Sequence, residues 1–312
     1  LDLSGTTFNL ETDLRDSISY IGYDSNDYIQ WSNNGWTRTV VNGTERLRVD
    51  TAGIDVSGRA IIDTTLTVGS SHSNTGTLSS IAGGTLNTAS ANYSFIGGGY
   101  RNRAVSEYNF IGSGADNLTY NTWASIVGGE DNVAGGAHSS VGGGKGNIVN
   151  VASNCSTIAG GLLNCVNAVT STVVGGSYNT ITRPMMTGVS NSFIGGGSYN
   201  TITGSNSFIG SGKNNTSSAD CTFIRGGSYN TVNDSHSTIG GGTTNAIASL
   251  GCSTIAGGKA NCIKSTEFYG TIAGGYNNTL GDVSGYCTGN FIGGGVSNKV
   301  MFASNNTIGG GC

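Results

Sequence analysis

Isolated branched apolar residues, each followed by a glycine cluster, recur from residue 79 to the end of the sequence. We call these residues the anchors: Ile81, Ile96, Ile111, Ile126, Val141, Ile158, Val173, Ile194, Ile209, Ile224, Ile239, Ile255, Ile272, Ile292 and Ile308. Most anchors are 15 residues apart, and the other spacings are 16, 17, 20 or 21 residues. Helical solenoid repeats need about 30 residues or more. The period therefore predicts two short strands and two turns, which make one rung of a β-solenoid.

Glycine and asparagine hold fixed positions after the anchors. Glycine lies three residues after every anchor, from Gly84 to Gly311. Asparagine lies six residues after every anchor whose unit is long enough. Glycine suits positive φ and close backbone approach, and asparagine bonds backbone in turns and can stack in ladders. We predict a structural ladder of Asn87, Asn102, Asn117, Asn132, Asn147, Asn164, Asn179, Asn200, Asn215, Asn230, Asn245, Asn261, Asn278 and Asn298.

Each rung has little to bury. Besides the anchor, most units offer one small or branched apolar residue eight positions later, such as Val166 or Ile181. A buried Ile contributes roughly 1.5–3 kcal/mol, whereas ordering the backbone costs ~1–2 kcal/mol per residue. Six units place Phe just before the anchor, on the opposite strand face: Phe95, Phe110, Phe193, Phe208, Phe223 and Phe291. We expect chains to associate along this Phe stripe, most simply as a homotrimer.

Residues 1–78 follow a different pattern. Short alternating runs such as Arg46–Asp50 and Thr65–Val68 predict strands, glycine and asparagine punctuate them at Asn42 and Gly43, and no helical period is present. We therefore expect an all-β protein in two parts. Residues 1–78 would form a β-rich shaft or collar, and residues 79–312 a parallel β-solenoid, or β-roll, of about fifteen rungs. Because residues 1–5 resemble residues 54–58, we also expect the chain to be part of a longer protein.

Composition and charge argue against several classes of protein. The chain has 54 Gly but one Pro, 10% charged residues and a net charge of −4, which is neither collagen-like nor typical of disorder. It has no basic stripe of the kind that binds nucleic acid. It has no apolar run approaching the roughly 20 residues that span a membrane. We therefore expect neither nucleic-acid binding nor membrane insertion.

No set of residues predicts catalysis, a metal or a cofactor. Glycan-cleaving enzymes need paired carboxylates, and in the repeats only Glu130 and Asp131 are adjacent, in a predicted turn. Calcium-binding β-rolls use a repeated Asp as the ligand, whereas this chain has Asn. We expect no catalytic, metal-binding or cofactor-binding residue.

Four of the seven cysteines have matched positions. Cys155 and Cys165 lie three before and seven after one anchor, and Cys252 and Cys262 do the same around another. Positions about one rung apart satisfy the Cα spacing of a disulfide, roughly 4.4–6.8 Å. Two disulfides are therefore one interpretation, and buried or reduced thiols are the other.

The longer spacings predict loops. Insertions in a solenoid emerge on one side, often the binding side. Tyr178, Tyr199 and Tyr229 share one position, where exposed rings can stack on sugars. Loops that merely fill a trimer groove are the alternative. As candidate receptor contacts we take Arg183, Met185, Met186, Tyr199, Phe268, Tyr269 and Tyr286.

Two units, residues 192–200 and 237–245, resemble the head repeats of YadA-type trimeric autotransporter adhesins. The resemblance implies a left-handed parallel β-roll whose three chains pack side by side. It covers about three quarters of the chain. The repeats depart from that family in having Ile-Gly-Gly-Gly rather than Ala-Ile-Gly, and 15 residues rather than about 14.

Residues 45–54 resemble a segment of bacteriophage and algal-virus tail-fibre shafts. Together the two resemblances favour a structural and adhesive segment of a trimeric viral tail fibre, located on the virion. They imply a host-surface glycan or outer-membrane receptor, and other fibre or baseplate proteins, as partners. The alternatives are the head of a bacterial adhesin, an ice-binding solenoid and a glycan-degrading tailspike. The position before the anchor, where Phe, Thr and Ser alternate, argues against the flat Thr array of an ice binder.

Overall fold

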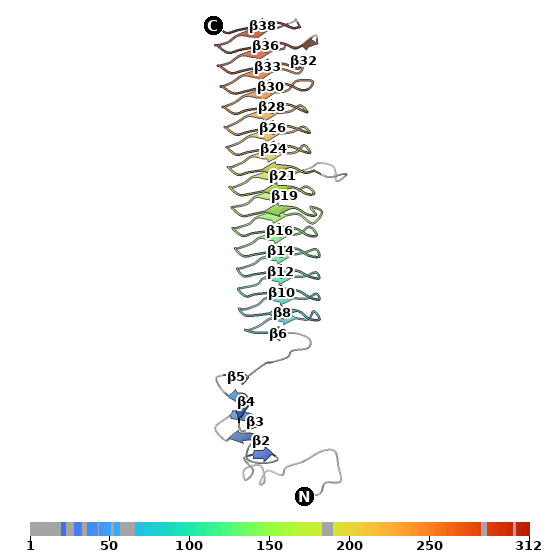
Figure 1. The fold of residues 1–312 in the computed structure, drawn as a ribbon, viewed down its shortest axis with the longest axis vertical. Coiled ribbons are helices and arrows are strands. Elements are labelled where there is room, and N and C mark those ends of the chain that lie inside the picture. The colour runs from blue at the N-terminus through green and yellow to red at the C-terminus, as the bar shows by residue number, and fades with distance from the viewer. Residues whose placement is uncertain are drawn as a thin grey trace. The chain divides into compact units, whose positions relative to one another are not determined.

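The computed structural model describes residues 20–22, 28–32, 36–42, 44–50, 53–56, 66–182, 190–281, 286–301 and 304–312. The chain divides into two compact units, Leu1–Asp63 and Thr64–Cys312. Every regular element among the described residues is a β-strand (Figure 1). The all-β prediction is confirmed.

The first unit holds a five-stranded antiparallel sheet in which each strand pairs with the next along the chain. A tight turn at Asn42, with φ of 53°, joins the third and fourth strands, as the Asn-Gly pair predicts. Across these strands Arg38 donates to Gln30 and pairs with Glu45 at 3.3 Å. The strands are β1 (Tyr20–Gly22), β2 (Tyr28–Ser32), β3 (Trp36–Val41), β4 (Thr44–Asp50) and β5 (Gly53–Val56).

The second unit is a parallel β-solenoid whose rungs stack along one axis (Figure 1). Its first sheet has 16 strands and contains the anchors. These strands are β6 (Leu66–Thr67), β8 (Ser80–Ile81), β10 (Phe95–Ile96), β12 (Phe110–Ile111), β14 (Ser125–Ile126), β16 (Ser140–Val141), β18 (Thr157–Ile158), β20 (Thr172–Val173), β22 (Phe193–Ile194), β24 (Phe208–Ile209), β26 (Phe223–Ile224), β28 (Thr238–Ile239), β30 (Thr254–Ile255), β33 (Thr271–Ile272), β36 (Phe291–Ile292) and β38 (Thr307–Ile308).

The second sheet of the solenoid has 15 strands, most of which begin one residue after a ladder asparagine. They are β7 (Ser73–Asn74), β9 (Thr88–Ala89), β11 (Arg103–Ala104), β13 (Leu118–Thr119), β15 (Val133–Ala134), β17 (Ile148–Val149), β19 (Cys165–Asn167), β21 (Thr180–Thr182), β23 (Thr201–Ile202), β25 (Thr216–Ser217), β27 (Thr231–Val232), β29 (Ala246–Ile247), β31 (Cys262–Ile263), β34 (Thr279–Leu280) and β37 (Lys299–Val300). The predicted solenoid of about fifteen rungs is confirmed.

The core consists of two columns of side chains, one from each sheet. Ile96 pairs in register with Ile81 below and Ile111 above, so identical positions stack without slippage. Each anchor from Ile81 to Ile292 has no exposed surface. On the facing strands the inward residue is small at first, as at Ala104, and becomes larger toward Ile263. One anchor and one facing residue per rung make up this narrow core.

The solenoid begins earlier than residue 79. β6 and β7 pair in parallel with β8 and β9, and Thr67 stands in register with the first anchor, Ile81. The compact unit accordingly starts at Thr64. The hydrophobic pattern missed this rung because a threonine holds the anchor position there.

The invariant glycine three residues after the anchor lies where the rungs approach most closely. Gly99 has φ of 93°, and a Cβ on it would lie 2.0 Å from the carbonyl oxygen of Gly114 in the next rung. Both the backbone conformation and the lack of space therefore exclude a side chain.

A fourth sheet interrupts the regular stack near its C-terminal end. Its two strands, β32 (Glu267–Phe268) and β35 (Cys287–Thr288), pair in parallel outside the two long sheets. They arise from the two longer units that contain Phe268 and Tyr286. Figure 1 shows β32 at the edge of the roll.

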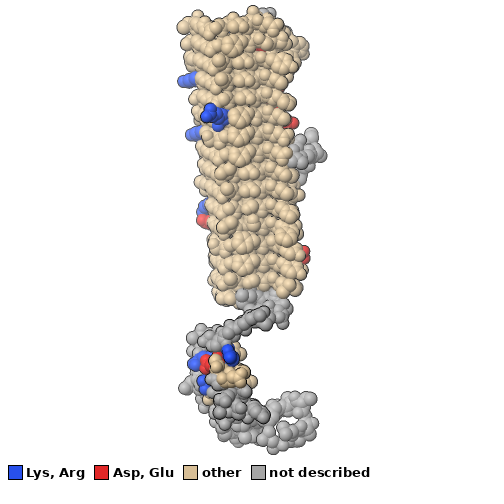
Figure 2. Space-filling view, viewed as in Figure 1, with Lys and Arg blue, Asp and Glu red and all other residues tan. Residues whose placement is uncertain are grey.

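Charges are sparse on the solenoid. The face seen in Figure 2 is mostly uncharged, with scattered basic and acidic side chains. Two ion pairs link neighbouring rungs, Arg101 with Asp116 at 2.6 Å and Lys145 with Glu130 at 2.9 Å. The hydrogen bond that Lys145 donates to Glu130, and the negative charge of that carboxylate, raise the pKa of Lys145. Both pairs are solvent-exposed and are therefore weak contributors to stability.

Candidate functional site

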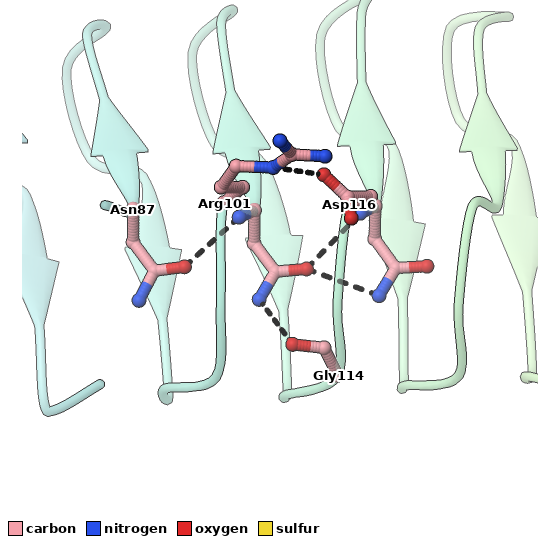
Figure 3. A network of polar contacts seen from close by, with 6 residues as sticks. Asn87, Arg101, Gly114 and Asp116 are labelled. Carbon is pink, nitrogen blue, oxygen red and sulfur yellow. Dashed lines mark hydrogen bonds and ion pairs between the residues drawn. The ribbon is translucent and has the colours of Figure 1, made fainter. Parts of the chain in front are cut away.

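The predicted asparagine ladder forms along one corner of the roll (Figure 3). Asn102 donates its backbone N–H to Oδ1 of Asn87 at 2.9 Å, and Asn117 donates its backbone N–H to Oδ1 of Asn102 at 3.1 Å. The same contact repeats from rung to rung up to Asn298. All members from Asn87 to Asn278 are fully buried, whereas Asn298 is half-buried.

Asn102 uses the full hydrogen-bonding capacity of its side chain. The Oδ1 atom of Asn102 accepts two N–H groups of Asn117. Its side-chain nitrogen donates to the carbonyl oxygens of Gly98 at 2.9 Å and Gly114 at 2.8 Å. An amide has two donor hydrogens and two acceptor lone pairs, so none remains for a ligand. The geometry agrees with a structural role for these residues.

A second polar ladder, which the sequence analysis missed, lies two residues before the anchors. Ser171 donates its backbone N–H to Oγ of Ser156 at 3.0 Å, and Ser192 and Ser207 continue the pattern at 3.3 Å each. Serine, threonine or asparagine fills this position in most units. This recurrence in the sequence could have revealed the second ladder. Small polar residues are so common in the chain, however, that the pattern did not stand out.

A buried glutamate takes the place of a missing side chain where the second ladder is interrupted. Gly270 holds the ladder position before Ile272 and has no side chain to offer. Glu267, with no exposed surface, accepts the backbone N–H of Asn290 at 3.2 Å and its side-chain N–H at 2.9 Å. Asn290 then accepts the N–H of Asn306 at 2.9 Å. A carboxylate from the inserted strand β32 thus replaces the missing ladder side chain.

The Phe stripe lies on the outer face of the anchor sheet. Phe110 is 41% exposed, and its ring stacks on Phe95 at 5.7 Å between centroids. Phe193, Phe208 and Phe223 form a second stack, at 5.3 Å and 4.9 Å. The predicted outward position of these rings is confirmed.

Side-chain sizes on this face are complementary within a rung. Five of the six Phe rungs carry Gly two residues later, and Arg225 is the exception. A Cβ placed on Gly210 would lie 3.3 Å from the ring of Phe208, so the ring reaches over the glycine. Rungs with Ser or Thr before the anchor often carry Ala or Val after it, as at Val127 and Ala159. Most rungs thereby place one apolar side chain on this face, whereas the rungs of Ser140, Thr238 and Thr307 have Gly after the anchor and place none.

In four successive rungs the turn position three residues before the anchor carries a stacked aromatic side chain. Tyr93, Tyr108, Trp123 and His138 form one continuous stack with centroid distances of 4.9, 4.2 and 6.2 Å and interplanar angles of 5° or less. All four have φ between 55° and 61°, a conformation that bulky residues rarely adopt. Stacking, worth about 0.5–1.5 kcal/mol per pair beyond burial, offsets this strain.

Tyr178, Tyr199 and Tyr229 each lie five residues after an anchor, but they differ in how much of each ring face is open to a sugar. Tyr178 and Tyr199 stack at 4.7 Å with an angle of 2°, so each ring covers one face of the other. Tyr229 has Asn214 and Thr244 at the corresponding positions of the neighbouring rungs. Tyr199 therefore presents mainly its edge and one face to solvent.

The other predicted contact residues separate into two groups. Arg183, Met185 and Met186 lie outside the described residues. Phe268, Tyr269 and Tyr286 come together, although they derive from two different insertions. The ring of Phe268 lies 6.3 Å from that of Tyr269 and 6.4 Å from that of Tyr286. Tyr269 is 62% exposed and Tyr286 81% exposed.

The structure contains no disulfide among the cysteines. All seven are free thiols, so neither of the predicted pairs is formed. Cys155 lies in the turn before β18 with positive φ, whereas Cys165 begins β19 in the other sheet. Matching distances from an anchor therefore did not place the two residues as partners. Burial raises the pKa of the Cys165 and Cys262 thiols, and Asn150 opposes this at Cys165 by a hydrogen bond.

Within the described ranges, no three His, Cys, Asp or Glu side chains are grouped so that they could hold a metal ion. The same part of the chain has no helix of the length and hydrophobicity that crosses a bilayer.

A comparison with protein-family models gives no match, and neither does a comparison with curated proteins. The class of the protein therefore comes from its fold. It is a parallel β-solenoid repeat protein of about 15 rungs, with a small antiparallel sheet in the preceding unit.

Proposed function

We propose that this chain is a segment of a homotrimeric fibre, a viral tail fibre that contributes to attachment at the host surface. The observation that carries the proposal is the exposed Phe stripe on a narrow roll. Large exposed apolar patches on soluble proteins mark interaction sites. A second copy of the same roll offers a partner whose rungs have the matching period. The resemblances to adhesin heads and tail-fibre shafts favour three chains and a left-handed roll.

The internal construction of the roll suits a passive, load-bearing role. Its two polar ladders and two long sheets connect each rung mainly to its neighbours, as in other solenoids. The ladder amides from Asn87 to Asn278 are buried and bonded to neighbouring rungs, so recognition falls to the outer faces and the insertions. Host-surface glycans or outer-membrane components are the proposed receptors, and other fibre or baseplate proteins the proposed neighbours in the virion.

The trimer is tested by light scattering on the purified chain. We expect a mass three times the 31.5 kDa of one chain. The triple variant Phe193→Ser, Phe208→Ser, Phe223→Ser removes one stack, and serine already holds this position at Ser125 and Ser140. It should dissociate to monomers at concentrations where the wild type stays trimeric. Tyr199→Ser, which removes an exposed ring outside this sheet face, is the matched control and should remain trimeric.

Attachment is tested separately from assembly. Labelled wild-type chain is applied to a panel of bacterial cells, and binding to a subset of strains is expected. A folded wild-type monomer would refute the trimer. A trimer that binds no cell in a broad panel would refute the attachment role while leaving the assembly intact.

A further inference from the structure

We propose that Tyr269 and Tyr286, arranged around Phe268 near the C-terminal end of the roll, form a carbohydrate-binding platform. Its ligand is a pyranose ring of a surface polysaccharide. The inference rests on the proposed attachment function and specifies where, and through which chemistry, attachment occurs.

The rings of this cluster differ from the stacked aromatic rings of the solenoid. In the Tyr93–His138 stack and the Phe stacks, neighbouring rings are nearly parallel and cover one another's faces. Phe268 instead meets Tyr269 at 36° and Tyr286 at 49°. At these angles neither ring lies flat over the face of its neighbour, and Tyr269 and Tyr286 remain 62% and 81% exposed. A sugar binds an aromatic residue through its face, so this cluster has the geometry that the stacks lack.

The next rung toward the C-terminus explains why the ring of Tyr269 has no side chain stacked on it from that side. Tyr269 occupies the turn position that elsewhere holds stacked residues such as Trp123, and it has the same positive φ, 55°. The equivalent position of the next rung is Gly289, whose N–H bonds to the carbonyl oxygen of Phe268 at 2.9 Å. A glycine there supplies no side chain to cover the tyrosine. The column of turn side chains is thus interrupted at Gly289, next to Tyr269.

Strand pairing and side-chain hydrogen bonds fix the platform, in addition to the loop backbone. β32 and β35 pair Glu267 with Cys287 and Phe268 with Thr288. The buried Glu267 carboxylate fixes the base of β32 to Asn290 through two hydrogen bonds. The N–H of Leu250 also donates to the carbonyl oxygen of Glu267 at 2.9 Å. Binding groups on such a fixed support lose little conformational entropy when the ligand binds.

Tyrosine suits this ligand class chemically. A pyranose has an apolar face of C–H groups surrounded by hydroxyls, and tyrosine combines an apolar ring with a polar tip. The ring centroids of Tyr269 and Tyr286 lie 6.3 Å and 6.4 Å from that of Phe268. The three rings are therefore close enough to contact one bound oligosaccharide.

The test uses the full chain on a glycan array, followed by titration with the best oligosaccharide found. Tyr286→Ala and Tyr269→Asn should each lower affinity about tenfold, which corresponds to about 1.4 kcal/mol. Asparagine is chosen because Asn191 and Asn206 already occupy the equivalent turn with positive φ. Tyr108→Asn is the matched control. That ring is exposed but covered on both faces by Tyr93 and Trp123, so affinity should not change.

A second variant covers the platform without removing any ring. Gly289→His continues the turn column with a residue type found there at His138 and His236. The nearest obstacle to its Cβ is the side-chain oxygen of Asn305, at 2.7 Å, which can rotate away. We expect the loss of binding seen for Tyr269→Asn, with an unchanged circular dichroism spectrum.

The outcomes separate this inference from the proposed function. Wild-type chain that attaches to cells but binds no glycan overturns the platform and leaves the attachment role standing. Equal glycan affinity in wild type, Tyr286→Ala and Gly289→His overturns it as well. Failure of both cell attachment and glycan binding overturns the proposed function itself.

Discussion

The asparagine ladder gives the sharpest test of how the roll is held together. Asn132 lies in its middle, fully buried. Its Oδ1 accepts the backbone N–H of Asn147 at 3.0 Å, and its side-chain nitrogen donates to the carbonyl oxygen of Gly128 at 3.1 Å. Asn132→Ala removes both contacts at once. The contact with Asn147 is buried, so water cannot replace it without opening the rung, whereas the contact with Gly128 is partly buried.

The size of the effect follows from these partners. A buried donor or acceptor left without a partner costs about 1–3 kcal/mol. The buried Asn147 N–H carries this cost, and the partly buried Gly128 carbonyl adds less, so we expect a loss of about 1–3 kcal/mol. The carbonyl oxygen of Gly144, which also accepts from Asn132, keeps the backbone N–H of Glu130 at 2.9 Å and adds little.

The assay is denaturant unfolding followed by circular dichroism, combined with hydrogen exchange to locate the loss. Exchange should accelerate first at Asn147 and the adjacent rungs, because a solenoid couples mainly nearest neighbours. Asn233→Ala is the control: that asparagine is exposed on the facing sheet, and its removal should change stability by less than about 0.5 kcal/mol. If the Asn132 and Asn233 variants unfold alike, the ladder does not stabilise the roll as argued.

Three further outcomes are expected. Gly114→Ala, at φ of 106° and with its Cβ 2.1 Å from a backbone oxygen of the next rung, should prevent soluble folding; soluble expression with native circular dichroism would contradict this. Glu267→Ala should remove the two hydrogen bonds that Asn290 donates to this carboxylate and lower the free energy of unfolding by about 1–3 kcal/mol, measured by denaturant titration, with faster hydrogen exchange confined to the C-terminal rungs. Because burial raises the pKa of Cys165 and Cys262, their thiolates should form only above about pH 8.5, the value for a free thiol. Labelling rates at each cysteine, followed by mass spectrometry against pH, should show half-maximal reaction above that pH, and a midpoint below it would contradict the effect of burial.

Regular positions of the repeat could be predicted because each satisfies a local requirement that recurs in every unit. An invariant glycine implies positive φ or contact with backbone, and Gly99 shows both. An invariant asparagine at a bend implies a side chain that bonds backbone, as Asn102 does. Phe before the anchor implies the outer strand face, where Phe110 lies.

Positions that break the period could not be predicted in the same way. Thr67 stands where an anchor belongs, so its rung has no hydrophobic signal. Cys155 and Cys165 keep the same distances from an anchor as the second cysteine pair, yet the turn and the sheet place them apart. The number of residues between two positions in one rung does not give the spatial distance between them across the roll.

Sequence alone determined the rung, its period, its two inward columns and the asparagine ladder, because the same backbone conformation recurs wherever the same residues recur. Tertiary structure alone decided which ring faces remain open and which side chain completes an interrupted ladder. Glu267 reaches Asn290 across 23 residues, and Gly289 leaves Tyr269 uncovered from the next rung. Such contacts form between rungs of unequal length, where no fixed spacing in the sequence identifies the partner.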